Sequence, residues 1–129
     1  MTRTNKTLLN DWLLSLKTIL HVKGDIKLTF YPCAAIGRHY RHNKTNSSKI
    51  NLNPNYDMAV LIPTLIHEVE HVRQWESGDM KEGEKGIYHR WYKGVEYPDM
   101  QKIEHRQRPW EAEAYLALLR VAEDLGIEY

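Results

Sequence analysis

The sequence is poor in cysteine, in net charge and in long apolar runs, and each shortage excludes a class of protein, site or partner. Cys33 is the only cysteine among 129 residues, which excludes a disulfide framework and a thiolate-rich zinc site. The formal net charge is +1, so no overall field favours nucleic acid or a membrane surface as a partner. A metal site in this chain must use histidine and carboxylate, and the seven histidines make one feasible.

No apolar segment reaches the length of a membrane-spanning helix, and polar residues interrupt the first apolar segment, residues 8–20. That segment also lacks a small-residue cleavage site, so we predict no signal peptide. We expect a cytoplasmic protein without membrane contacts, located in the host cytoplasm or in the virion if a phage encodes it. The composition is that of a globular chain, and we expect a single domain over residues 1–129.

The first half of the chain begins with an amphipathic helix. Apolar residues recur at helical spacing from Leu8 to Leu20. We expect Thr4 or Thr7 to cap the start of this helix and Gly24 to end it. A helix of this kind packs one apolar face on a core, and here we expect it to lie across a sheet.

A small sheet is expected next. Apolar and polar residues alternate through residues 26–31, which is typical of a half-buried strand, and Pro32 ends it. Residues 34–40 and 49–53 predict a second and a third strand, with a polar turn at residues 43–48 between them. We therefore expect a meander of three strands.

The second half of the chain predicts two helices on either side of a loop-rich segment. The first of them contains Pro63, which favours a helix start near Ile62 after a lead-in turn. Residues 76–108 are rich in glycine and in scattered aromatic residues, and we expect one or two short helices there that cover a site. The last helix is expected to start at Pro109 and to stop at Gly126. Together these elements predict an α+β fold.

Residues 67–71 read His-Glu-Val-Glu-His, and helix geometry explains why this spacing suits a metal site. Residues four apart lie on one face of a helix, so His67 and His71 can bind one metal ion. Glu68 lies beside that face, where its carboxylate can reach a water molecule on the metal and act as a general base. An apolar stripe beside the histidines is expected to bury the helix and to turn both histidines toward the rim of the core.

A catalytic zinc site needs a third protein ligand and an open position for water. The candidates for that ligand are His89, His105, Glu111 and Glu113. On the last predicted helix, Glu111 shares a face with small and apolar residues, whereas Glu113 lies on the polar side. A carboxylate on an inward face needs a partner, so we favour Glu111 as ligand over the alternative that its charge only stabilises the helix start.

Two supporting roles stay open in the sequence. We interpret Glu70 as a water-exposed surface residue, with a pairing to Arg73 or support of a metal ligand as the alternatives. The oxyanion that develops on an attacked carbonyl needs a donor besides the metal. The candidates for that donor, or for support of a ligand, are Tyr115, His105, Tyr92, Tyr88 and His89.

A helix with His-Glu-x-x-His, followed by a helix with Glu-x-x-Ala, resembles the gluzincin class of zinc metallopeptidases. The second motif reads Glu111-Ala112-Glu113-Ala114, and residues 108–115 are similar to small predicted metallopeptidases of bacteriophages and mobile elements. The resemblance covers residues 49–119 and implies a zincin-like fold with zinc held by His67, His71 and Glu111. Many relatives have Asp or Asn where this chain has Tyr115, which leaves the residue that supports a ligand histidine unassigned.

The expected function is hydrolysis of peptide bonds in a protein or peptide substrate, with zinc as cofactor and Glu68 as base. A strand at residues 48–52, if it is a sheet edge, could hold an extended peptide. The rival interpretations are a non-catalytic zinc-binding structural or adaptor protein, such as a virion component, and a nucleic-acid-associated protease. The latter would dock through the basic residues 38–44, which a solvated hairpin tip explains more simply, so a nucleic acid partner is the weaker expectation.

Overall fold

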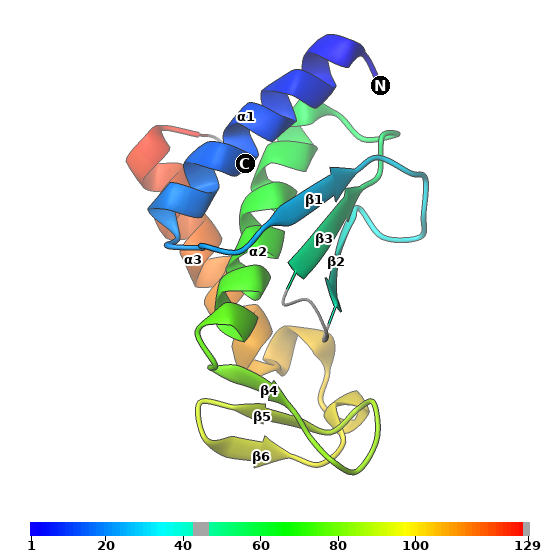
Figure 1. The fold of residues 1–129 in the computed structure, drawn as a ribbon, viewed down its shortest axis with the longest axis vertical. Coiled ribbons are helices and arrows are strands. Elements are labelled where there is room, and N and C mark those ends of the chain that lie inside the picture. The colour runs from blue at the N-terminus through cyan, green and yellow to red at the C-terminus, as the bar shows by residue number, and fades with distance from the viewer. Residues whose placement is uncertain (43–46, 128–129) are drawn as a thin grey trace.

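The computed structural model describes residues 1–42 and 47–127, and these residues form an α+β fold (Figure 1). The α-helices are α1 (Arg3–Ile19), α2 (Met58–Glu76) and α3 (Pro109–Leu125). The first sheet contains β1 (Ile26–Thr29), β2 (Gly37–His42) and β3 (Ser47–Leu52). The second sheet contains β4 (Met80–Glu82), β5 (Arg90–Tyr92) and β6 (Val95–Tyr97). Two 3-10 turns, η1 (Met100–Lys102) and η2 (His105–Gln107), precede α3.

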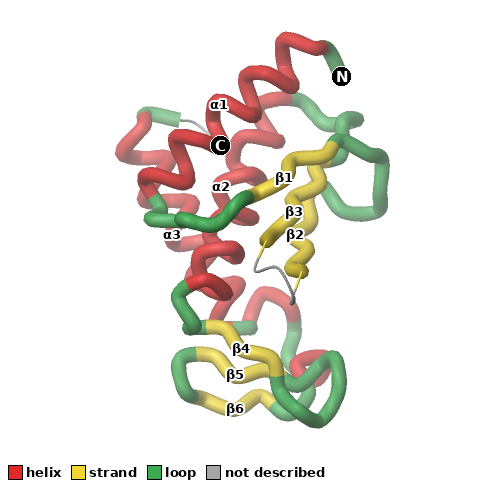
Figure 2. The backbone as a smooth tube through the Cα atoms, in the orientation of Figure 1, coloured by secondary structure: helices red, strands yellow, loops and turns green. Residues whose placement is uncertain are grey.

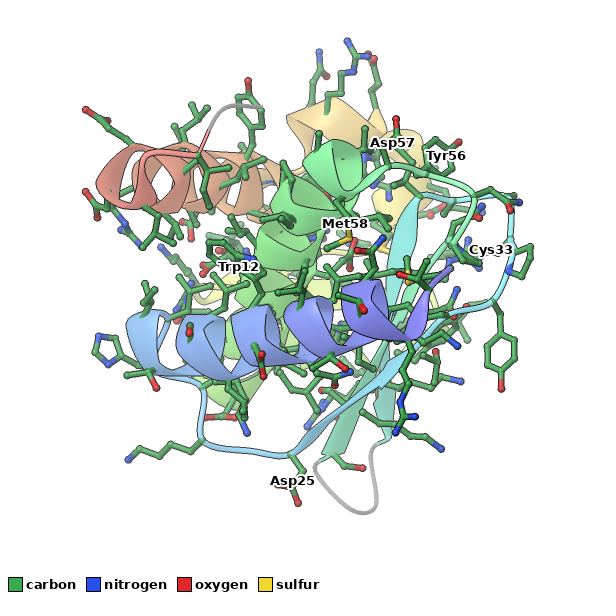
Figure 3. All side chains as sticks on the ribbon, turned by 90° about the horizontal axis from the view of Figure 1, so that it is seen from above. Trp12, Asp25, Cys33, Tyr56, Asp57 and Met58 are labelled. Atoms are coloured by element: carbon green, nitrogen blue, oxygen red, sulfur yellow. The ribbon has the colours of Figure 1, made fainter. Side chains whose placement is uncertain are left out.

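The first predicted helix is present as α1, with both of its ends shifted. The side chain of Thr2, not that of Thr4 or Thr7, accepts the capping hydrogen bond from the start of the helix. The helix ends at Ile19, before the predicted glycine, because the chain turns where His21 adopts a φ of 58°. Figure 3 shows Trp12 on the side of α1 that faces α2.

α2 begins at Met58, one turn before the predicted start near Ile62, and Figure 3 labels this entry to the helix. Pro63 therefore lies inside the helix, where it removes the single hydrogen bond that its own N–H would have donated. The first turn forms regardless, because the amides of Val60 and Leu61 both donate to the carbonyl of Asp57 at 2.9 Å. The apolar face of the helix thus extends unbroken through the proline.

The first sheet is not the predicted meander, because β3 is its central strand. β1 pairs with β3 in parallel and β2 pairs with β3 antiparallel. The expectation that residues 48–52 form a sheet edge is therefore wrong. The edge that lies against α2 belongs to β2.

Buried asparagine side chains explain how β2 reaches the far side of β3. Asn51 accepts a hydrogen bond from the amide of Tyr31 and donates one to its carbonyl, both at 2.9 Å. Asn53 donates to the carbonyl of Cys33 at 2.8 Å. These contacts hold the long connection from β1 to β2 in place of a tight turn, and Figure 3 shows Cys33 on this exposed loop.

One apolar core fills the space between the three helices and the first sheet. α2 lies in the middle of this arrangement (Figure 1). The fully buried members of the core include Leu9, Leu16, Ile50, Leu52, Leu61, Leu65, Ile66 and Val69. Burial of each such side chain contributes about 1.5–3 kcal/mol, so α2 is anchored along most of its length. Among the described residues, no helix is both long and apolar enough to span a bilayer.

The second sheet was missed by the sequence analysis, although the short helices expected in residues 76–108 are present as η1 and η2. Figure 2 shows this sheet beyond the C-terminal end of α2. Lys93 and Gly94 join β5 to β6 with φ values of 49° and 79°, as a two-residue hairpin loop requires. Met80, Tyr92 and Trp110 form its small core.

Candidate metal centre

α2 and α3 meet at the three ligands that the sequence favours. His67 and His71 lie one turn apart on α2, and Glu111 lies in the first turn of α3. The Nε2 of His67 is 3.1 Å from the Nε2 of His71 and 3.1 Å from Oε2 of Glu111. The Nε2 of His71 is 2.9 Å from Oε1 of Glu111. The structure thus brings together two imidazole nitrogens and one carboxylate that could hold a metal ion.

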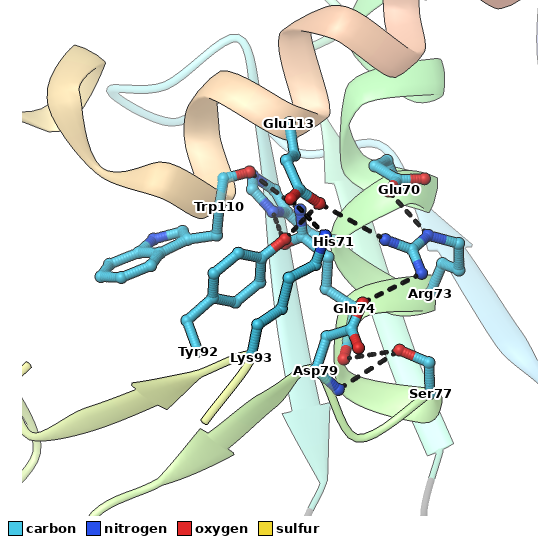
Figure 4. Close-up of polar contacts among 10 residues, drawn as sticks. All are labelled: Glu70, His71, Arg73, Gln74, Ser77, Asp79, Tyr92, Lys93, Trp110 and Glu113. Carbon is cyan, nitrogen blue, oxygen red and sulfur yellow. Dashed lines mark hydrogen bonds and ion pairs between the residues drawn. The ribbon is translucent and has the colours of Figure 1, made fainter. Parts of the chain in front are cut away.

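Gln74 fixes which nitrogen of His71 faces this cluster (Figure 4). Its Nε2 donates to the carbonyl of Trp110 at 2.8 Å, so its Oε1 accepts from Nδ1 of His71 at 2.9 Å. The Nε2 of neutral His71 is then an acceptor that faces other acceptors. A proton on Nε2 of His71 or a bound cation can bridge these atoms, and two imidazoles with one carboxylate are ligands that zinc accepts.

Gln74 is also the supporting residue that the sequence analysis left unassigned. It is fully buried and lies three residues after His71 on α2. Because Trp110 immediately precedes Glu111, the amide that orients His71 also fixes the start of α3 against α2. An uncharged polar residue at this spacing after the second histidine was the signal that could have found it.

The charges in the cluster depend on one another. Burial alone would lower the pKa of His71, but the hydrogen bond and the charge of Glu111 raise it to about 9. Burial acts in the opposite direction on Glu111, whose pKa is nevertheless held well below its ordinary value by His67 and His71. Without a metal, the cluster therefore carries a proton at neutral pH, and a metal ion must displace that proton.

Glu68 lies beside the ligands and is only 8% exposed. Burial raises the pKa of its carboxyl group, against the opposite effect of the two histidines. β2 passes closely over this residue, because a Cβ on Gly37 would lie 3.5 Å from Cγ of Glu68 and 2.5 Å from Cγ2 of Thr64. A carboxyl group with a raised pKa beside such a cluster is a candidate general base.

A cleft of about 690 Å³ lies over the cluster and over Glu68. Its floor is the face of α2 from His67 to Trp75, and one wall is β2. The opposite wall contains residues of β4, β5 and the segment that precedes α3. A cleft of this size accommodates a small ligand or a stretch of extended peptide.

Comparisons with protein-family models, with curated proteins and with solved structures found no match for this chain. The basis for a function is therefore the geometry of the cluster and of its cleft. The remaining predicted site residues divide according to whether they reach that cleft.

His105 reaches the cleft. Its Nε2 lies 3.5 Å from Oε2 of Glu111, and its side chain is 68% exposed. The other oxyanion candidates do not line the cleft: Tyr115 and Tyr88 are exposed, and the hydroxyl of Tyr92 donates to Glu113. His105 is therefore the predicted donor that remains in position.

His89 is a structural residue of the second sheet. It is 3% exposed, and its Nδ1 accepts a hydrogen bond from the amide of Lys85 at 3.0 Å. Its proton is therefore on Nε2, which donates to Oε2 of Glu96 at 2.8 Å. Gly83 makes room for the ring, because a Cβ there would lie 2.0 Å from it. Both ring nitrogens are thus engaged away from the cluster.

Glu70 and Glu113 belong to a polar network that joins α2 and α3 to the second sheet (Figure 4). Glu70 is 3% exposed and accepts from Nε of Arg73 at 2.6 Å, so its predicted exposure is wrong and the alternative pairing is present. The error arises because α3 and the second sheet cover this side of α2. Glu113 accepts from Tyr92 and Lys93 and does not reach the metal cluster.

Proposed function

We propose that this chain is a zinc metallopeptidase of the gluzincin class with a zincin-like fold. The observation that carries the proposal is the convergence of His67, His71 and Glu111 within 2.9–3.1 Å, beside a buried Glu68 and beneath a cleft. Three protein ligands with an open side are the catalytic form of zinc coordination. Two ligands on one helix and the third on the next helix support the gluzincin class in particular.

Each residue of the site has a role in such a reaction. Zinc, when bound, would supply a Lewis acid that polarises a carbonyl and lowers the pKa of water. Glu68 would accept the proton of the attacking water and pass it to the leaving amine. His105 would donate a hydrogen bond to the carbonyl oxygen from the open side. The outer edge of β2 borders the cleft and could pair with the backbone of an extended peptide.

Zinc binding by two variants of α3 tests the metal site. The parent should bind one zinc ion per chain, and Glu111→Ala should bind it at least about a hundredfold more weakly. Glu113→Ala is the matched control, because it removes a carboxylate two residues away that belongs to the polar network. A folded parent that binds no added zinc, or an equal loss in both variants, would contradict the proposal.

Hydrolysis of a peptide mixture by the zinc-loaded protein tests the reaction. Glu68→Gln should keep its zinc and lose about 10²–10⁴-fold in rate, because the amide cannot accept the proton. Equal rates for parent and variant would show that Glu68 is not the base.

The position of His105 supports a second candidate, a non-catalytic structural zinc site. Structural sites have four protein ligands, and a small movement of this ring toward Glu111 would supply the fourth. Zinc affinity of His105→Ala separates the two functions. If His105→Ala lowers the zinc affinity as much as His67→Ala does, the structural site is favoured. If His105→Ala leaves the zinc affinity unchanged and slows hydrolysis, the peptidase is favoured. The high exposure of His105 favours the peptidase.

A further inference from the structure

We propose that the cleft selects acidic peptides through arginine side chains that line it beyond the metal cluster. This inference rests on the proposed peptidase function and names the class of its substrate. Four arginines line the cleft and come from three separate segments: Arg38 and Arg41 from β2, Arg90 from β5, and Arg108 from the residue before α3.

Among the described residues, carboxylates compensate these arginines only beyond ion-pair distance, as Glu82 does for Arg90 and Glu68 for Arg38. None of the four forms an ion pair within 4.0 Å, whereas Arg73, outside the cleft, pairs with both Glu70 and Asp79. Two of the three carboxylates that line the cleft, Glu68 and Glu111, belong to the metal site. The part of the cleft beyond the metal therefore has an excess of positive charge that an anionic ligand would compensate.

The ring of Trp75 makes cation–π contacts with two of these arginines. The guanidinium carbons of Arg41 and Arg90 lie 4.8 and 5.6 Å from the centre of its ring. The two arginines come from different sheets and contact the same ring. Burial lowers the pKa of Arg90, although Glu82 acts in the opposite direction, so the charge of Arg90 is incompletely compensated within the chain. A carboxylate bound in the cleft near Trp75 would compensate this charge.

The distance from the metal site suits a side chain of a bound peptide. Trp75 lies four residues after His71 on α2, which corresponds to about 6 Å along the helix axis. An extended peptide advances about 3.3 Å per residue. An Asp or Glu about two residues from the bond that is cleaved would therefore reach Arg41 and Arg90.

A peptide fits these features better than a nucleic acid does. The arginines line a cleft of limited volume rather than a broad convex face, and the net charge of the chain is only +1. The basic residues 38–44 had suggested either a solvated hairpin tip or a docking patch. Arg38 and Arg41 instead line the cleft, and residues 43 and 44 lie outside the described residues.

Binding to an inactive variant tests the selection directly. Zinc-loaded Glu68→Gln is titrated with a labelled peptide rich in Asp and Glu, and with the same peptide in which these residues are Asn and Gln. The acidic peptide should bind at least about tenfold more tightly by fluorescence anisotropy, and high salt should reduce the difference. Adding Arg41→Gln and Arg90→Gln should abolish the preference, whereas adding Arg3→Gln on α1 should preserve it. If the variant with both Arg41→Gln and Arg90→Gln does not fold, the variant with Arg41→Lys and Arg90→Lys should show a weaker preference for the acidic peptide.

The outcomes separate this inference from the proposed function. Equal binding of the two peptides, or cleavage of a peptide mixture by the parent without a preference for acidic residues, would overturn the selection alone. Binding of the acidic peptide without cleavage of any peptide by the zinc-loaded parent would support the selection and count against the peptidase. Tighter binding of a single-stranded oligonucleotide than of the acidic peptide, lost on the same arginine substitutions, would replace the peptide by a nucleic acid.

Discussion

The two sheets of this molecule have equal numbers of strands, yet different forces attach them to the helices. The first sheet packs on the large apolar core through Ile50 and Leu52, both fully buried. The second sheet contributes Met80, Tyr92 and the partly buried Tyr97 to a small core, and hydrogen bonds and ion pairs supply the rest of its attachment. Polar contacts at a partly exposed site are individually weak, so we expect the second sheet to open locally while the first remains folded.

This difference separates the two parts of the candidate site. The helices that share the large core carry the candidate metal ligands, whereas the second sheet supplies part of a wall of the cleft. In the proposed peptidase, a rigid site below a wall that can open would combine fixed catalytic geometry with access for a peptide.

Leu65→Ala should destabilise the whole molecule by about 2–5 kcal/mol, because it leaves a cavity at the centre of the main core. Leu65 is fully buried on α2, two residues before His67. Urea unfolding followed by circular dichroism measures the change. Met80→Ala, in the small core, should lower global stability by less than half as much. Equal losses would show that the two cores form one cooperative unit.

Metal-free protein should lose up to about 3 kcal/mol of stability between pH 6.5 and 9. Folding raises the pKa of His71 from 6.5 to about 9, so its contribution is complete below pH 6.5 and vanishes as the pH rises through 9. The second sheet should not respond in this window, because burial and Glu113 raise the pKa of Tyr92 above its ordinary value. Thermal unfolding across this range measures the slope.

One variant tests the assignment of this slope to His71. His71→Gln should flatten the dependence of stability on pH, and an unchanged slope would contradict the assignment.

Folding lowers the pKa of His39 to about 4, mainly through burial, so the contribution of His39 to stability is present above pH 6.5 and is lost as the pH falls toward 4. The stability of the metal-free protein should therefore be highest near pH 6.5. Zinc affinity should instead rise with pH, because zinc displaces the proton.

Gly37→Ala should cost about 1–3 kcal/mol and displace β2 from α2, because the new methyl group would overlap Cγ2 of Thr64. Adding Thr64→Ser removes that methyl group and keeps the hydroxyl, which donates to the carbonyl of Val60 at 2.8 Å. Chemical denaturation of the double variant should show that most of the loss is recovered. If Thr64→Ser gives no recovery, the contact between β2 and α2 does not limit stability.

The predictable part of the fold and site is the part that local periodicity determines. α1, α2 and α3 are each long enough for the helical spacing of apolar residues to be clear. The proximity of His67 and His71 was predictable because the two residues share a helix face, a relation fixed by geometry within four residues. The inward position of Glu111 was predictable because the apolar residues of its own helix define a distinct inward face.

The remaining features depend on contacts between distant segments. The central place of β3 depends on Asn51 and Asn53, whose side chains hold a loop that lies about twenty residues earlier in the chain. Strands of three residues are too short to show an alternating pattern, so the second sheet had only Lys93-Gly94 as a local signal. Burial of Glu70 requires α3 and the second sheet, which no pattern within α2 reveals.

Tyr92→Phe and Lys93→Met should have the smallest effects, and their difference tests whether burial decides the strength of the polar network. Both side chains donate to Glu113, but Tyr92 is 3% exposed and Lys93 is on the surface. Loss of the buried donor should cost about 1 kcal/mol and loss of the exposed one less than about 0.5 kcal/mol. Amide hydrogen exchange should accelerate across β4, β5 and β6 in Tyr92→Phe and stay unchanged in α2, since only the attachment of the second sheet weakens. Exchange that accelerates equally in α2 would mean that the second sheet opens only when the main core unfolds, and the wall of the cleft would then be as rigid as the metal site.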